Sequence, residues 1–212
     1  NRMNLTRSKK KDLLYVAVAA FFFLTACVLQ TVDDYISDWF VKKTIALLTQ
    51  YIFFGLLAYW TASVISRISD KSICSGIIVA IALMGVILFV RLLKYHVFYE
   101  ETATRYLWYS YYIPQCIAPV VLLLTILGMG RKDGKPLAKG WYLLFLPAAA
   151  LILLVFTNDL HEQVFSFAEG LDYSNKIYKW EWGYYLLLSW MIELYLSICE
   201  LLSVKHRISR NR

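Results

Sequence analysis

The sequence predicts an all-α protein: a polytopic membrane helix bundle of about six transmembrane helices. Hydrophobic residues make up 59% of the 212 residues, whereas charged residues make up only 17%. The hydrophobic residues form long unbroken blocks, of about the 20 residues that a helix needs to cross a bilayer. Inside lipid each backbone polar group must pair within the protein, so we expect these blocks to be helices.

Six blocks have this length, and they set the predicted domain organisation. A basic N-terminal segment, 1–12, and a basic tail, 205–212, flank a transmembrane region over residues 13–204. The predicted spans are 13–32, 45–65, 73–93, 106–128, 141–157 and 183–204.

Three prolines lie within the fourth and fifth spans. Proline has no backbone N–H and its ring crowds the preceding turn of a helix. We therefore expect Pro114 and Pro119 to kink the fourth helix and Pro147 to kink the fifth.

The distribution of charge predicts which ends face the cytoplasm. The net charge is +7, and the basic residues lie in the connectors and at the two ends of the chain. Alternate connectors on one side carry about twice as many Lys and Arg residues as those on the other, which places both termini on the cytoplasmic side. We expect these residues to set topology and to attract anionic lipid, because a nucleic-acid binder would gather them on a folded polar surface.

The first span has two further interpretations. A basic segment followed by an apolar run resembles a secretory signal peptide. Residues 24–27 read Leu-Thr-Ala-Cys, which resembles a bacterial lipobox in which Cys27 would be lipidated after cleavage. The apolar run continues past Cys27 to Val32, which favours an uncleaved helix. Cleavage and lipidation at Cys27 stay open as alternatives.

Glu193 is the most unusual residue of the predicted bundle, because it lies near the middle of the sixth span. An ionised carboxylate at the centre of a membrane helix costs about 2.5–3.5 kcal/mol even on the gentler scales. Gln115 has nearly the same depth in the fourth span, so the sequence allows a Glu193–Gln115 hydrogen bond that could include Tyr112. This group either joins helices, or forms a ligand or proton site near the midplane, or faces a partner chain.

Other polar residues lie near the predicted outer face. Arg91 is close to the outer end of its span and can extend its charge to the interface. Asn158 and His161 directly follow the fifth span, where His161 is also a candidate for a pH-sensitive surface group. The full set of candidate ligand-binding residues is Glu193, Gln115, Tyr112, Arg91, Asn158 and His161.

Catalytic and metal-binding motifs are not recognisable, so we expect no enzyme activity and no cofactor or metal. The segment around His161 lacks the second His of a zinc-protease helix. The basic loop around Gly130 to Lys135 lacks the first Gly and the final Ser or Thr of a phosphate-binding loop.

Four phrases spread over residues 89–191 carry a resemblance to a known family, in the same order and with similar connectors. They are FVRLLKYHVF, RYLWYSYYIPQ, LLVFTNDLHEQVFSF and WGYYLLLSWM. Together they resemble the seven-helix N-terminal input region of bacterial sensor histidine kinases. The sequence has six spans where that family has seven, and it has neither the phospho-acceptor box nor the ATP-binding boxes of a kinase.

The resemblance implies a sensory role. By analogy, the chain would be a truncated or partial input module in the bacterial plasma membrane, relaying an unknown signal to a cytoplasmic histidine kinase or output domain, fused or separate. A change in helix packing, read at the cytoplasmic tail, would carry the signal. The expected partners are the lipid bilayer and that output domain, with a homodimer left open and no nucleic acid.

Two other classes of function remain as alternatives. The first is a small transporter or channel subunit, for which the sequence offers no internal repeat and only one deep ionisable residue. The second is a protein that anchors or assembles others at the membrane.

Overall fold

The computed structural model describes residues 2–33, 35, 37–98, 100–129, 137–167 and 178–210. Several sequence predictions therefore fall outside the described residues. These are the basic loop over 130–136, the middle of the longest connector over 168–177, the last two residues of the basic tail, and the side chains of the basic N-terminal segment.

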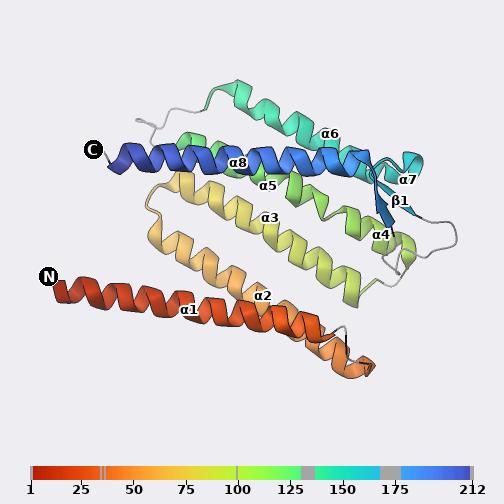
Figure 1. Ribbon diagram of the computed structural model, residues 1–212, viewed down its shortest axis with the longest axis horizontal. Coiled ribbons are helices and arrows are strands. Elements are labelled where there is room, and N and C mark those ends of the chain that lie inside the picture. The colour runs from red at the N-terminus through yellow and green to blue at the C-terminus, as the bar shows by residue number, and fades with distance from the viewer. Residues whose placement is uncertain are drawn as a thin grey trace. The chain divides into compact units, whose positions relative to one another are not determined.

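Helices dominate the described part of the chain (Figure 1). Six of them, with α4 and α5 counted as one and η2 and α6 as another, are long and apolar enough to cross a membrane, and they lie where the sequence predicts six apolar helices. The elements in order are α1 (Arg2–Asp33), α2 (Trp39–Arg67), α3 (Lys71–His96), α4 (Glu101–Tyr109), α5 (Tyr112–Gly128), the 3-10 helix η2 (Lys139–Leu144), α6 (Phe145–Phe156), α7 (Asn158–His161), β1 (Phe165–Phe167), β2 (Tyr178–Trp180) and α8 (Trp182–Arg210).

Large apolar side chains cover the outside of these helices. Phe21 is 65% exposed, Leu153 64% and Leu196 58%. Exposed apolar surface on this scale is unfavourable in water and suits helices that face lipid.

The chain divides into two compact units, Asn1–Ser63 and Val64–Arg212. In the first unit, α1 and α2 meet through the ring pairs Tyr15–Tyr59 and Phe23–Phe53. They line an open apolar pocket of about 420 Å³. Its lining residues are Tyr15, Val18, Ala19, Phe22, Tyr51, Ile52, Gly55, Leu56 and Tyr59.

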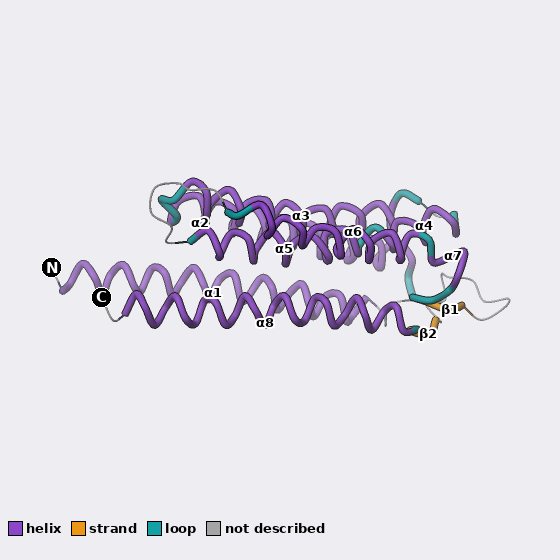
Figure 2. Tube along the Cα trace, turned by 90° about the horizontal axis from the view of Figure 1, so that it is seen from above, coloured by secondary structure: helices purple, strands orange, loops and turns teal. Residues whose placement is uncertain are grey.

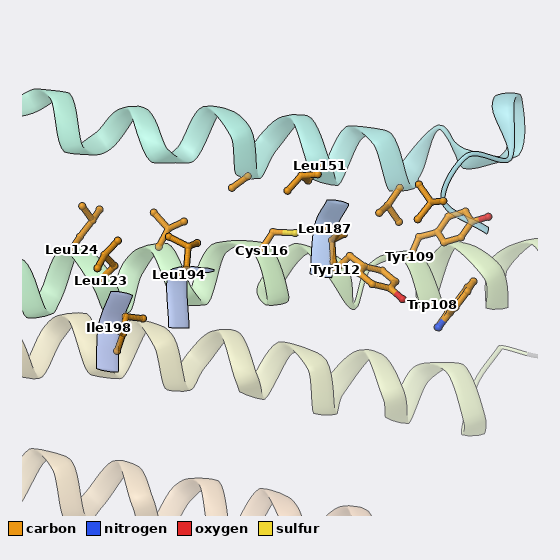
Figure 3. Close-up of a cluster of buried hydrophobic side chains, with 14 of the residues drawn as sticks. Trp108, Tyr109, Tyr112, Cys116, Leu123, Leu124, Leu151, Leu187, Leu194 and Ile198 are labelled. Atoms are coloured by element: carbon orange, nitrogen blue, oxygen red, sulfur yellow. The ribbon is translucent and has the colours of Figure 1, made fainter. Parts of the chain in front are cut away.

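In the second unit α5 is the central helix, in contact with α3, α6 and α8. Figure 2 shows α3, α5 and α6 in one layer with α8 along one of its faces. The buried side chains of α5, with those of α6 and α8, form the core of this unit (Figure 3). They include Tyr112, Cys116, Leu123, Leu151 and Leu194.

The predicted fourth helix is two helices in the structure. The break falls at Ser110 and Tyr111, between α4 and α5. Pro114, four residues after Ser110, has no N–H to bond the Ser110 carbonyl, which instead accepts the Ile113 N–H at 3.3 Å. The prediction of an irregularity caused by Pro114 is confirmed, whereas α5 continues as a helix through Pro119.

The fifth span also changes character along its length. It begins as the 3-10 helix η2 and becomes α-helical at Phe145, two residues before Pro147. Proline is tolerated in the first turn of an α-helix, where its missing N–H would have no partner in the helix. The irregularity predicted at Pro147 therefore takes the form of a new helix start.

A two-stranded antiparallel sheet, formed by β1 and β2, is the β-structure in the described residues. Phe165 pairs with Trp180 and Phe167 with Tyr178, so the ends of the predicted polar connector fold into a hairpin. We call the end of the second unit that carries it the hairpin end.

At the opposite end of the second unit, Lys205 of α8 joins the last turn of α5. Its ammonium donates hydrogen bonds to the carbonyl oxygens of Ile126 and Met129. The last carbonyls of a helix have no partner within it, and a cation there also complements the helix dipole. Lys205 therefore ties the ends of α8 and α5 together.

Candidate functional site

Asn158 is the best-bonded polar side chain of the hairpin end. It follows Thr157, where α6 stops, and it is completely buried. Its amide oxygen accepts the backbone N–H groups of Val164 at 2.9 Å and Phe165 at 3.0 Å. Its amide nitrogen donates to the Phe165 carbonyl at 2.8 Å and to the Tyr109 hydroxyl at 3.3 Å.

These four bonds use the full capacity of the amide, which has two N–H donors and two acceptor lone pairs. Only an amide offers both kinds of group to the Phe165 backbone at once. Asn158 therefore fixes the first residue of β1 against the end of α6.

Asp159, the residue after Asn158, connects α7 to α4. One carboxylate oxygen accepts the Tyr109 hydroxyl at 2.7 Å, and the other lies 3.4 Å from the Nε atom of Arg105. Arg105 and Tyr109 are four residues apart, so they share one face of α4. We call Arg105, Tyr109, Asn158 and Asp159 the Asn158 network.

An aromatic cluster packs against this network and shares Tyr109 with it. We define it by Trp108, Tyr109, Tyr112, Phe165, Tyr178 and Tyr184. The rings of Trp108 and Phe165 are 4.4 Å apart, and those of Trp108 and Tyr178 are 4.8 Å apart. Each such pair contributes about 0.5–1.5 kcal/mol beyond its buried area, so the cluster holds the hairpin on α4 and α5. Figure 3 shows Trp108, Tyr109 and Tyr112 in succession at this end of the core.

The hairpin leads without a break into α8. The Ser166 hydroxyl donates to a carboxylate oxygen of Glu181 at 2.7 Å, and the Glu181 N–H donates to the Val164 carbonyl at 3.0 Å. The Gly183 N–H, in the first turn of α8, donates to the Gln163 carbonyl at 2.9 Å. That N–H would have no partner within the helix, so the hairpin caps α8.

Gly183 is needed for this close approach. A Cβ atom there would lie 2.8 Å from the Gln163 oxygen. Gly183 therefore lets the first turn of α8 contact the hairpin backbone directly.

His161 holds the turn between α7 and β1. Its Nδ1 atom accepts the Gln163 N–H at 3.0 Å, so the ring proton is on Nε2. The Thr157 hydroxyl donates its proton to the Leu153 carbonyl, so its oxygen is free to accept. The Nε2 atom of His161 lies 3.1 Å from that oxygen and can donate to it. His161 is thus bonded as a neutral imidazole.

The structure brings together three of the residues predicted from the sequence. Asn158, His161 and Tyr112 all lie at the hairpin end, with Tyr112 buried against Trp108 and Phe165. Arg91 lies on α3, half-buried, with its guanidinium 5.9 Å from the ring of Tyr95.

The predicted Glu193–Gln115 pair does not form. Gln115 is half-buried, Glu193 lies on an exposed face of α8, and no hydrogen bond joins them in the structure. Leu194, next to Glu193, lies farther along the bundle than Cys116, next to Gln115 (Figure 3). Depth counted within each span does not determine which side of a helix faces its neighbour: Leu194 lies on the buried side of α8, whereas Glu193 lies on the exposed side.

Sequence reasoning missed several partners in the Asn158 network and the hairpin. Arg105, Asp159, Glu181 and Phe165 were not among the candidate residues. Two signals were present in the sequence. Arg105 and Tyr109 are four residues apart, which is the spacing of a shared helix face. The polar residues Thr157, Asn158 and Asp159 mark the end of the fifth apolar block.

Hydrogen bonds and an ion pair within the Asn158 network join α4, α7 and β1. Within the described residues no three His, Cys, Asp or Glu side chains are placed to hold a metal ion.

Comparison with protein-family models, with curated proteins and with solved structures gives no match for this chain. The functional argument therefore depends on the geometry of the chain itself.

Proposed function

We propose that this chain is a membrane-embedded sensory input module of a signal-transducing histidine kinase. In this proposal the hairpin end faces outward and receives the signal, both termini are cytoplasmic, and α8 passes the change to an output domain, fused or separate. The resemblance of RYLWYSYYIPQ and LLVFTNDLHEQVFSF to such input regions supports the kinase partner. Both phrases fall on the Asn158 network and the aromatic cluster.

One observation carries the proposal: α8 joins the two ends of the second unit. It runs from Trp182 to Arg210 as one helix, about 44 Å long at 1.5 Å per residue. This exceeds the hydrocarbon core of about 30 Å, so both of its ends reach the interfaces. Its first turn is bonded to the hairpin, and Lys205 is bonded to α5 at the other end.

The mechanism that fits this geometry is a shift between two packings of α8 against α5. Packed helices move by small discrete steps, so a ligand or a membrane state that displaces the hairpin also displaces α8. Lys205 holds one of the two positions through the Ile126 and Met129 carbonyls. Release of Lys205 would mark the other position.

Buried polarity in the second unit supports sensing over transport. Among the described residues the first unit buries Thr49 and Gln50, and the Thr49 hydroxyl has no hydrogen-bond partner, whereas the buried polar side chain of the second unit is Asn158. Asn158 lies at the hairpin end, and its hydrogen-bonding capacity is filled by the protein. A transport pathway places polar or ionisable groups near the midplane and leaves them open to the substrate.

A fusion of the full chain to the dimerisation and ATP-binding domains of a histidine kinase, joined after Arg212, tests the proposal. Autophosphorylation in membrane vesicles is the readout. Tyr109→Phe removes the hydroxyl that bonds Asp159 and Asn158 but keeps the ring, and Lys205→Met removes the bonds to α5. Each removed bond is worth about 0.5–1.5 kcal/mol, so we expect phosphorylation to change by about two- to tenfold.

Leu160→Ala is the matched control at the hairpin end, because Leu160 is 85% exposed. It should leave phosphorylation at the wild-type level. If Tyr109→Phe and Lys205→Met also leave it unchanged while inserting and folding normally, α8 does not transmit a signal and the proposal fails.

A further inference from the structure

Two basic and two phenolic side chains gather where α3 meets the junction of α4 and α5. The Arg91 guanidinium lies 5.9 Å from the ring of Tyr95. The Lys94 ammonium lies 5.1 Å from the ring of Tyr95 and 5.9 Å from that of Tyr111. Lys94 thus lies over both phenol rings and Arg91 over one of them, so the four side chains form one group.

Two hydrogen-bond donors in this group have no acceptor. Arg91 is half-buried, yet it forms no hydrogen bond or ion pair within the described part of the chain. The Tyr111 hydroxyl is covered by the protein and also lacks a partner. Burying a polar group without a hydrogen bond is unfavourable, and an ionised group inside a membrane span is more so.

A second cation, Lys94, lies close to Arg91. Arg91 and Lys94 are three residues apart on α3, so their like charges lie on neighbouring positions of one helix face and repel. The nearest acidic residues along the chain, Glu100 and Glu101, are exposed at the start of α4. Asp159, on the side of α4 bonded to α7, is engaged by Arg105 and Tyr109.

We propose that this group is a binding site for a single phosphate or carboxylate group. The Arg91 guanidinium, which can present two parallel N–H donors, would hold the anion, and Lys94 would add its charge. The Tyr111 hydroxyl, which has no hydrogen-bond partner, would be a further donor. The site is independent of the sensory proposal.

The anion could come from a lipid headgroup or from solution. Arg91 is five residues from the end of α3 at His96, so in a bilayer spanned by α3 it would lie toward one interface. Basic pockets between membrane helices commonly take anionic lipid headgroups. A small dissolved anion would present the same phosphate or carboxylate chemistry.

Lipid retention tests the first source. The full chain is purified into nanodiscs that contain phosphatidylcholine and a minor fraction of phosphatidylglycerol, and bound lipid is counted by native mass spectrometry after release. We expect Arg91→Gln to lower retained phosphatidylglycerol by about tenfold or more, because a bidentate charged contact is lost. Tyr111→Phe should lower it by a few-fold.

Matched controls separate this site from general attraction to the membrane. Lys139→Gln removes an exposed basic residue at the start of η2, and Tyr142→Phe removes an exposed phenol one turn later. Both should retain wild-type amounts of phosphatidylglycerol.

Thermal unfolding in nanodiscs of phosphatidylcholine alone tests the second source. Millimolar inorganic phosphate or acetate should raise the melting temperature of the wild type but not of Arg91→Gln. A response in either experiment that Arg91→Gln and Tyr111→Phe abolish supports the site and identifies the source. If neither experiment distinguishes these variants from their controls, Arg91 only extends its charge to the interface and the proposal is wrong.

Discussion

Asn158 shows how one side chain can fix a local fold. Its amide meets three backbone groups of residues 164 and 165 and the hydroxyl of a residue 49 positions earlier. Removing such a side chain leaves buried donors and acceptors unpaired, at about 1–3 kcal/mol for each group. The hairpin end should therefore be more sensitive to this position than to any exposed neighbour.

The distinction between Asn and Asp tests this explanation. Asn158→Asp keeps the shape but loses the two N–H donors and places a carboxylate beside the Phe165 carbonyl. We expect a loss of about 3 kcal/mol or more in the free energy of unfolding, measured by thermal denaturation in detergent. Faster hydrogen exchange at the Val164 and Phe165 amides should accompany it.

Gln163→Ala is the control for this prediction, because the Gln163 side chain is exposed and only its backbone bonds α8. It should change stability by less than about 0.5 kcal/mol. Equal stability of Asn158→Asp and Gln163→Ala would show that the four bonds do not hold the hairpin.

Among the elements, α3 and α5 make the closest approach in the second unit. Gly76 of α3 faces Thr125 of α5, and a Cβ atom at Gly76 would lie 2.0 Å from the Thr125 hydroxyl oxygen. Small residues at helix contacts let backbones come close, and this drives packing where lipid removes the hydrophobic effect between helices.

Gly76→Ala should therefore destabilise the protein by about 1–3 kcal/mol, the usual range for overpacking. Gly55→Ala is the matched control: it places the same methyl group within α2, where nothing lies within 4 Å. It should be neutral or stabilising by up to about 1 kcal/mol, because Ala is the better helix former. Thermal unfolding of both variants, with Gly76→Ala recovering in part when Thr125→Ala is added, would establish the contact.

Lys205 makes a similar test possible at the end of α8. Lys205→Met should loosen the last turn of α5 by about 1 kcal/mol, seen as faster hydrogen exchange around Met129. His206→Gln, adjacent and exposed, should leave that exchange unchanged. If hydrogen exchange around Met129 is unchanged in Lys205→Met, water bonds the Ile126 and Met129 carbonyls as well as the ammonium does.

For the whole molecule, length and composition were sufficient to predict the six long apolar helices. An apolar run of about 20 residues has few alternatives to a helix, so local sequence decides this level. The irregularities at Pro114 and Pro147 were also predictable, because proline acts on its own turn. The finer form, a break at Ser110 and a 3-10 start at Lys139, depends on packing.

The site was only partly predictable, because its bonds join distant segments. Asn158, His161 and Tyr112 could be selected as polar or aromatic residues at a span end. Their partners could not, since the hydrogen bonds of Tyr109 reach residues 49 and 50 positions away. The Glu193–Gln115 prediction was wrong for the same reason: which side of a helix faces its neighbour is set by packing, which the residue count within each span does not contain.

The sidedness of the bundle is the claim on which the sensory proposal depends. Leu160 at the hairpin end and Lys139 at the start of η2 are both exposed, and they lie at opposite ends of the fifth span. Leu160→Cys and Lys139→Cys, each in a background without the four native cysteines, can be labelled with a membrane-impermeant maleimide on intact cells.

We predict that Leu160→Cys is labelled on intact cells, whereas Lys139→Cys is labelled only after the membrane is opened. If both cysteines are labelled from the same side, the hairpin end does not face outward. In that case α8 cannot pass a displacement of the hairpin across the membrane.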